Sequence, residues 1–360
     1  MLKLKYMNVC IIGDGLISIT LAKALVNQGI YVDIFASQNV NKINKSRTLA
    51  LSKVNVDFFN ENILNISNLL WEINKIEIYS ENLKDEKILN FENDKKNLFC
   101  IVKNHELYRN LILSLKRCSF FKKKNIINLK TQKYDLIINC DRNSFFSKKY
   151  FYKKLVKDYN SYAHTTIINH KRLIGNNTAS QIFTKKGPLA FLPISETKTS
   201  VVYSFKGSKN IDLENFIKKY NNKYSINKIE KIFYFELKSS ELKKYYYKNI
   251  LAFGDLLHKL HPLAGQGFNM SIRDIKLLLN LIRLKIDNGL ELDNSICVDF
   301  EKHARHKNYL FSQSIDFVYE FFNLERKIKN PILIKSVQLL GKNKYLNKIF
   351  TKFADNGLMI

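Results

Sequence analysis

Acidic residues are scarce in this sequence, and that scarcity dominates its charge. There are 32 Asp and Glu residues against 59 Lys and Arg residues, so the net charge is +27. The basic residues form no stripe with interleaved aromatic residues, which favours general Lys enrichment over nucleic-acid binding. A surface of this charge is nevertheless expected to be attracted to anionic lipid headgroups.

Paired cysteines and long apolar runs are also missing. No segment reaches the roughly 20 uninterrupted apolar residues of a membrane-spanning helix, and no signal peptide is expected because the first apolar run stops at Gly13. The sequence therefore predicts a cytoplasmic protein, peripheral at most on the inner membrane. The cysteines are scattered, without a CxxC pair, and predict reduced thiols with no disulfide framework (Cys10, Cys100, Cys118, Cys140 and Cys297).

The N-terminal residues have the layout of a dinucleotide-binding unit. Residues 8–12 (NVCII) predict a buried parallel strand, a helix should extend to about residue 28, and residues 31–35 predict a second strand. Gly13 and Gly15 suit the tight turn and the close approach of a pyrophosphate. Two positions depart from the pattern: Ser18 replaces the third glycine, and Ala36-Ser37 stand where an acid that binds the adenosine ribose is expected.

The rest of the chain predicts two further layers. Residues 56–70 and 104–115 look helical, residues 134–139 predict another buried parallel strand, and the alternating strands between 162 and 237 predict a mostly antiparallel sheet. The fold class is therefore α/β, with a Rossmann-like parallel-sheet domain, an inserted antiparallel sheet and a helical C-terminal tail. The predicted boundaries are 1–60, 100–150 and 248–300 for the discontinuous nucleotide-binding domain, 61–99 and 151–247 for the substrate domain, and 301–360 for the tail.

The most informative stretch is residues 251–280, LAFGDLLHKLHPLAGQGFNMSIRDIKLLLN. It reads as a buried strand, a Gly-Asp turn, a loop with His-Pro and Gly-Gln-Gly, and a long amphipathic helix. Gly265 and Gly267 would let the backbone approach a flat or charged ligand. The helix that follows directs unpaired N–H groups and a positive dipole end at that ligand.

Together with RTLALS at 47–52, this stretch resembles the FAD-dependent aromatic-ring monooxygenases, and within them the ubiquinone-biosynthesis hydroxylases. QIF at 181–183 followed by GPLAFLP at 187–193 is similar to the substrate-domain signature of that subgroup. Residues 321–358 also resemble the C-terminal region of the subgroup. The resemblance implies bound FAD, reduction by NAD(P)H, and hydroxylation of a polyprenylated phenol by O2 through a flavin C4a-hydroperoxide. It also implies contact with a membrane surface or a ubiquinone-biosynthesis complex.

The resemblance assigns roles to individual residues. Gly13, Gly15 and Ser18 would line the FAD pyrophosphate, and Arg47 and Arg109 would lie near the phosphate and ribitol. Asp255 would hold a ribitol hydroxyl. The flavin ring would be held by Pro262, Leu263, Ala264, Gly265, Gln266, Gly267 and Asn269, and the substrate would face Gln181, Phe183 and Pro188.

One departure from the family leaves an alternative open. The family's Asp-Gly motif after the third parallel strand is CDRNS here, so Arg142 replaces the glycine. With Ala36 in place of an acid as well, the chain could instead be a non-catalytic component of a biosynthetic complex that has kept the fold.

Two other patterns have competing interpretations. Asp255, His258 and His261 have D-x-x-H-x-x-H spacing, but a metal site needs about four converging ligands, and a flavin loop explains His-Pro better. No metal site is predicted, and His258 is expected to cap a loop rather than carry protons. Residues 332–353 form a basic amphipathic segment that either docks on the flavin domain or lies on a membrane.

Overall fold

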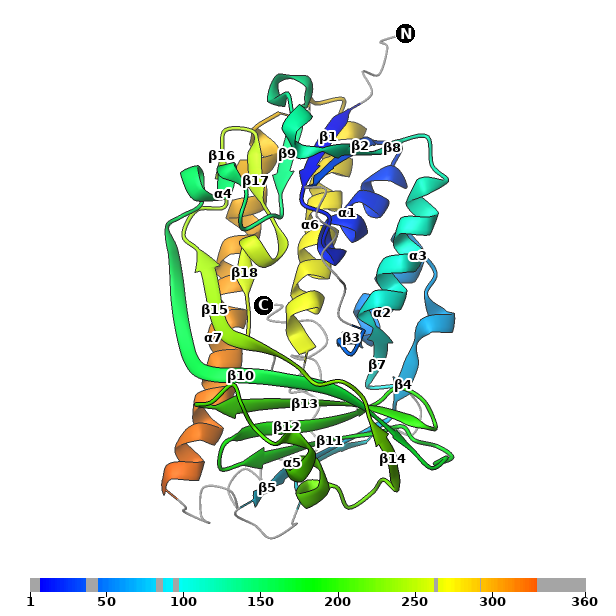
Figure 1. Cartoon of the computed structure of the whole chain (residues 1–360). Helices are drawn as coiled ribbons and strands as arrows, with labels where there is room; N and C mark the ends of the chain where they lie inside the picture. Colours follow the sequence, from blue (N-terminus) through cyan, green and yellow to red (C-terminus); the bar gives the residue numbers. More distant parts are fainter. Residues whose placement is uncertain are drawn as a thin grey trace.

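The computed structural model describes residues 7–36, 45–81, 87–92, 97–261, 265–291 and 293–328. Two large sheets dominate this part of the chain, one at the top and one at the bottom of Figure 1. The α/β class is confirmed, with a parallel Rossmann-like sheet and a separate, mostly antiparallel sheet. Residues 332–353, and nearly all of 321–358, lie outside the described residues or have undescribed side chains.

The upper sheet has six strands in the described chain, and five of them run parallel. The predicted strand at 8–12 is confirmed to the residue. A lysine-rich edge strand, which the sequence did not predict, extends the sheet beyond β2. In order across the sheet the strands are β16 (Tyr246–Tyr247), β17 (Ile250–Ala252), β9 (Leu136–Asn139), β1 (Asn8–Ile12), β2 (Tyr31–Ala36) and β8 (Phe121–Asn125).

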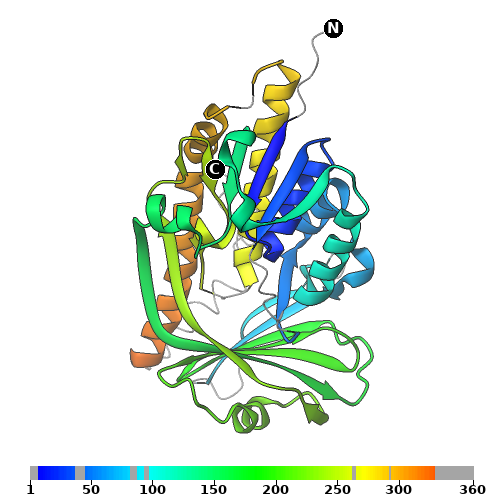
Figure 2. The same ribbon diagram turned by 45° about the horizontal axis from the view of Figure 1, so that its top comes forward.

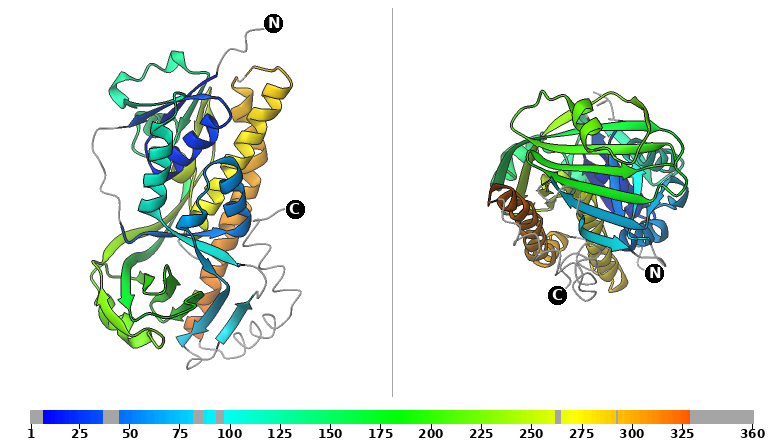
Figure 3. Two further views of the ribbon diagram at one scale, coloured as in Figure 1. Left: turned by 90° about the vertical axis from the view of Figure 1, so that its right-hand side faces the viewer. Right: turned by 90° about the horizontal axis from the view of Figure 1, so that it is seen from below.

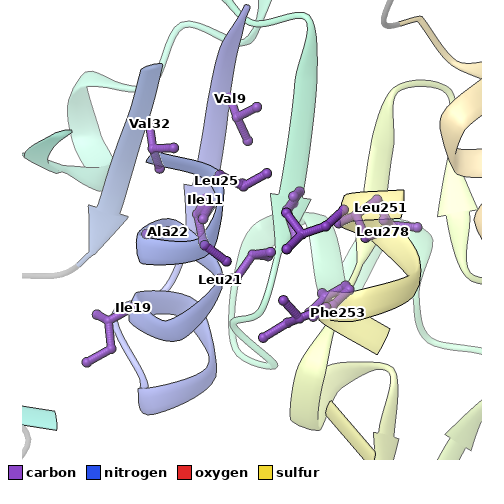
Figure 4. Packing of buried hydrophobic residues seen from close by; sticks show 14 of the residues in the cluster. Val9, Ile11, Ile19, Leu21, Ala22, Leu25, Val32, Leu251, Phe253 and Leu278 are labelled. Carbon is purple, nitrogen blue, oxygen red and sulfur yellow. The ribbon is translucent and has the colours of Figure 1, made fainter. Parts of the chain in front are cut away.

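Helices α1 (Leu16–Val26), α3 (Asn104–Lys116) and α6 (Gln266–Asp287) pack side by side against this sheet, with α1 in the middle. Figure 4 shows their apolar core, in which Ile11 of β1, Leu25 of α1 and Leu278 of α6 are completely buried. The predicted core stripe of α6 is confirmed at Ile272, Ile275, Leu279 and Ile282, whereas Ile286 is exposed.

The lower sheet has nine strands in the described chain, and Figure 2 shows it beneath the domain built on the upper sheet. Its longest strand, β10, starts beside the upper domain and crosses into the lower one (Figure 1). A short helix, α5 (Leu213–Tyr220), covers its outer face. The strands are β5 (Lys75–Ser80), β6 (Lys87–Glu92), β10 (Lys154–His170), β11 (Thr178–Thr184), β12 (Gly187–Pro193), β13 (Lys198–Lys206), β14 (Ile226–Ile229), β15 (Phe233–Leu242) and β18 (His258–Lys259).

A small sheet and two helices complete the described chain. β3 (Thr48–Ser52), β7 (Phe99–Lys103) and β4 (Trp71–Ile73) form a three-stranded antiparallel sheet. α2 (Lys53–Asn62) replaces the first half of the helix predicted at 56–70, which is wrong beyond residue 62. α4 (Phe145–Tyr150) follows β9.

α7 (Ser295–Ile328) joins the two domains, since it packs on α6 and then continues to the lower sheet (Figure 3). It runs without a break through the boundary predicted at 301. The predicted substrate domain also includes β16 and β4, but β16 pairs in the upper sheet and β4 in the three-stranded sheet. None of the described helices is long and apolar enough to cross a membrane.

Candidate active site

A cavity of about 1630 Å³ lies between the two domains. Its walls come from the β1–α1 loop, β3, the β9–α4 loop and the start of α6 on one side, and from the lower sheet on the other. Ligand pockets commonly enclose about 300–1,000 Å³. The cavity can therefore hold a large ligand together with a second, smaller one.

The β1–α1 loop presents a helix N-terminus to the cavity. Gly13 has φ +99°, and a Cβ there would lie 3.3 Å from Cβ of Asp141, so the turn requires glycine. Gly15 caps α1 with no side-chain hydrogen bond, and a Cβ there would meet nothing within 4 Å. The first turn of α1 carries no acidic residue. The free N–H groups and the helix dipole favour an anion at this position.

The start of α6 has the same features. Gly265 has φ +66°, and a Cβ there would lie 3.0 Å from Cβ of Ala50, which closes off one side of the turn. α6 also lacks a side-chain cap and a first-turn acid, and Gln266 and Gly267 line the cavity. Two uncapped helix N-termini thus open into one cavity. This arrangement fits a ligand that carries negative charge at one point and carbonyl oxygens at another, as FAD does with its pyrophosphate and its isoalloxazine ring.

The other predicted flavin-ring residues divide into two groups. Pro262, Leu263 and Ala264 lie outside the described residues. Asn269 lines the cavity, but its side chain is already bonded: Oδ1 accepts from Ser52 N (3.0 Å) and Nδ2 donates to Ala50 O (2.7 Å). Its side chain therefore fixes β3 against α6 and supports the loop that includes Gly265, which would hold the flavin ring.

Positive charges gather in the cavity beside Asp255. Arg47, predicted near the phosphate, lines the cavity, and so do Arg142 and Lys259. Burial, followed by the charge of Arg142, lowers the pKa of Lys259. Asp255 also lines the cavity. Of the cations here, sequence reasoning proposed only Arg47 as a ligand contact.

Arg109 is not part of this site. It is exposed on α3 and does not line the cavity, whereas its neighbour Tyr108 does. The place near the phosphate and ribitol that the family resemblance gave Arg109 therefore has no support from the lining of the cavity. Leu107 and Leu111 of the same helix are fully buried.

The end of β2 shows how the missing ribose-binding acid is replaced. Ala36 lines the cavity and pairs with Asn125 of β8, next to Lys123. Lys123 Nζ lies 2.7 Å from Asp14 Oδ2, within the Gly13–Gly15 turn. Where a carboxylate at the end of β2 is expected, this end of the cavity therefore offers the Asn125 amide and the ion pair of Lys123 with Asp14. Ser18 is buried beneath the turn and lines the cavity as predicted.

The lower sheet forms the opposite wall with small and apolar side chains. On β12, Pro188, Ala190 and Leu192 line the cavity, while Leu189 and Phe191 face the α5 core, as strand alternation requires. Gln181 lines the cavity as predicted.

Phe183 does not line the cavity, so its predicted role as a substrate contact was wrong. It is buried against Phe311 and Ile315 of α7, farther along β11. Because side chains alternate along a strand, Phe183 lies on the same face of β11 as Gln181. The packing of α7 against Phe183 could not be foreseen from the sequence.

A buried hydrogen-bond chain lies behind the flavin loop. His258 lines the cavity and its Nε2 lies 2.5 Å from Asp274 Oδ2; Asp274 Oδ1 accepts from Asn308 Nδ2 at 3.0 Å. β18 and α6 are thereby joined across the loop by a contact between side chains, whereas the role predicted for His258 was to cap a helix or loop. In the described chain no three metal-ligating side chains converge.

His261 lines the cavity and has a different environment. Among the described residues neither ring nitrogen has a partner, and burial lowers the pKa of His261 to about 3, so the ring is neutral at physiological pH. It packs between the rings of Tyr159 (4.7 Å between centroids) and Tyr319 (4.5 Å).

Comparison with solved structures decides the fold. p-Nitrophenol 4-monooxygenase PnpA from Pseudomonas putida superposes with a TM-score of 0.75 over 99% of both chains, at 11% identity. HpxO from Klebsiella pneumoniae, solved with FAD and uric acid, gives 0.74 over 97% of both chains, at 12% identity. The chain has the fold of the FAD-dependent monooxygenases.

Sequence comparison gives more specific relatives of this flavin monooxygenase fold. The chain resembles the mitochondrial ubiquinone biosynthesis monooxygenase COQ6 of Schizosaccharomyces pombe (20% identity over 62% of this chain and 57% of the relative). The COQ6 of Xenopus tropicalis is 23% identical over 58% of this chain and 54% of the relative. The matches thus span little more than half the length of these relatives. No protein-family model matches the chain.

Proposed function

We propose that this chain is an FAD-dependent NAD(P)H:O2 monooxygenase that hydroxylates the ring of a polyprenylated phenol in ubiquinone biosynthesis. The observation that carries the proposal is the pair of uncapped helix N-termini, α1 and α6, opening into one cavity. The similarity to COQ6 supports the choice of pathway and substrate.

The residues present fit FAD along its length. The amides at the start of α1 would bind the pyrophosphate next to Gly15, and Arg47 would neutralise part of its charge. Asp255 would accept a hydrogen bond from a ribitol hydroxyl. The amides around Gly267 would stabilise negative charge on the N1–C2=O edge of the ring. Bound FAD supplies the transfer of electrons from NAD(P)H to O2.

The lower sheet would position the substrate and keep water out. Pro188, Ala190 and Leu192 present a wall without charge, against which an aromatic ring and its isoprenoid chain can pack. Gln181 is one of several polar side chains of the lower sheet that line the cavity, with Thr165, Ser180 and Ser204, and it can bond a ring oxygen of the phenol. We assign no residue as a general base.

The visible spectrum of the purified protein tests the proposal. Absorption bands of oxidised flavin, either as isolated or after adding FAD, are expected. A protein that contains no flavin and takes up none would refute it.

One observation favours a second candidate function. Arg142 lines the cavity where the family has glycine, and Ala36 lines it where an acid is expected. A non-catalytic flavoprotein in a biosynthetic complex would tolerate both changes. NAD(P)H oxidation stimulated by a polyprenyl phenol excludes this candidate, whereas bound flavin without such oxidation supports it.

A further inference from the structure

A lysine-rich and apolar surface lies beside the cavity, and the flavin fold does not require it. It is formed by α4, the start of β10, and residues 243–249, which connect β15 to β17; these segments meet at the upper left of Figure 1. Backbone pairing of Lys154 with Leu242 and stacking of Tyr150 on Tyr247 (3.9 Å between centroids) hold the three segments together. We call this the α4 face.

The α4 face exposes large apolar side chains. Phe145 is 65% exposed, Tyr152 61%, Val156 55% and Leu155 49%. Isolated exposed hydrophobic residues are ordinary on protein surfaces, but a contiguous group marks an interaction site. Leu155 and Val156 are aliphatic, so stacking on nucleic-acid bases would not use them.

The same face is strongly and uniformly basic. No Asp or Glu occurs in residues 142–157 or 242–254. None of its exposed lysines forms an ion pair within the described chain. Those lysines are Lys148, Lys149, Lys153, Lys154, Lys243, Lys244 and Lys248.

We propose that the α4 face docks on a bilayer that contains anionic lipids. Phe145 and Leu155 would enter the boundary between headgroups and acyl chains, while the lysines contact the phosphates. Val156 follows Leu155 on β10, so its side chain points to the opposite face of the strand. Aromatic residues with an apolar body suit this boundary. The membrane segment expected from the sequence was the tail at 332–353, so this surface is a different one.

Docking by this face would bring the cavity close to the membrane. Arg142 and Asn143 line the cavity, and α4 begins two residues later, at Phe145. A prenylated phenol in the bilayer would then have a short path to the cavity; this last step rests on the proposed function. A lipid surface fits this face because its apolar side chains are exposed and its charged side chains are positive.

Co-sedimentation of the full chain with vesicles tests the proposal. We expect binding to phosphatidylcholine vesicles that contain phosphatidylglycerol, at about 0.1 M salt, and little binding to phosphatidylcholine alone. Replacing Lys148, Lys154 and Lys243 by Glu should weaken binding at least about tenfold. Replacing Phe145 and Leu155 by Ser should weaken it about fivefold or more.

A matched control separates the α4 face from the general charge. Lys171, Lys185 and Lys218 are exposed on the lower domain, and their replacement by Glu changes the net charge equally. Equal losses from both triple variants, or no vesicle binding by the unaltered chain, would overturn the proposal. The proposal would also be overturned if the chain bound a single-stranded oligonucleotide tightly and the Ser variants bound vesicles as well as the unaltered chain does.

The measurement needs neither flavin nor turnover, so its outcome is independent of the spectrum that tests the proposed function. Each variant changes only exposed side chains, and its melting temperature verifies the fold. As a second readout, Phe145→Trp should show a blue-shifted emission relative to the unaltered chain when anionic vesicles are added.

Discussion

His258 Nε2 lies 2.5 Å from Asp274 Oδ2, and both side chains are almost completely buried. The two residues stand on opposite sides of the loop that includes Gly265, at its entrance from β18 and in the third turn of α6. Asn308 of α7 supports the carboxylate from behind. The loop that would cradle the flavin ring is therefore held in place by a polar contact as well as by packing.

Asp274→Asn should destabilise the protein by about 1.5–3 kcal/mol, the range for a hydrogen bond to a charged group. The buried imidazole would lose its negatively charged acceptor while the shape of the side chain is kept. Urea unfolding followed by circular dichroism measures the change.

Asp287→Asn is the matched control, because Asp287 is exposed on the same helix. It should change the free energy of unfolding by no more than about 0.5 kcal/mol. If the two variants unfold alike, the buried pair contributes nothing to stability.

Gly13 and Gly15 should respond differently to replacement by alanine. Gly13→Ala forces a side chain into φ +99° and against Asp141, so we expect a loss of stability of about 1–2 kcal/mol. Gly15→Ala adds a methyl group in open space at the N-terminus of α1. Its stability should be unchanged, while its Kd for FAD should rise about tenfold or more, because the pyrophosphate approaches that point.

Differential scanning fluorimetry and flavin-fluorescence titration separate the two effects. A Gly15→Ala variant that binds FAD as tightly as the unaltered chain would contradict the placement of the pyrophosphate at α1.

Arg47 and Arg109 offer a test in which the same substitution is made at two sites. Arg47 lines the cavity and Arg109 does not, although both are exposed. Arg47→Ala should raise the Kd for FAD about tenfold or more, since a charge-assisted bond to phosphate contributes about 1.5–3 kcal/mol. Arg109→Ala should leave it within about twofold. Titration of the apoprotein measures both, and a larger effect at Arg109 would restore the expectation from the sequence.

Local patterns predicted the upper domain well because its signals are local. The strand at 8–12, the turn at Gly13 and the uncapped start of α6 each follow from a few adjacent residues. β8 was missed because an edge strand of sequence FKKKN shows no apolar alternation, and only its pairing with β2 makes it a strand.

Contacts between distant residues explain the remaining differences. α2 ends at Asn62 because the Asn27 side chain donates to the carbonyls of Asn62 (2.9 Å) and Ile63 (2.8 Å), and this satisfies the helix C-terminus from 35 residues away. The contact of His258 with Asp274 was not foreseen for a similar reason. The sequence placed His258 in a spacing with Asp255 and His261 that raised a metal site as an alternative, and only the fold brings the Asp274 carboxylate to the imidazole.

Glu241 makes the stability depend on pH. It is 7% exposed on β15, and burial raises its pKa to about 7, against the opposing charges of His258 and Arg305. Below pH 4.5 the carboxyl group is protonated in both the folded and the unfolded chain, so it has no effect. Between pH 4.5 and about 7 only the unfolded chain releases its proton, and the folded state loses stability as the pH rises.

Glu241→Gln removes this titration. Relative to the unaltered chain, the variant should gain stability progressively between pH 4.5 and 7, by at most about 3 kcal/mol, and the difference should stay constant above pH 7. Glu236→Gln on the same strand is the control, because Glu236 is exposed. Urea unfolding at several pH values measures both variants. A difference that shrinks as the pH rises would mean that the Glu241 carboxylate is ionised and stabilised by His258 in the folded protein.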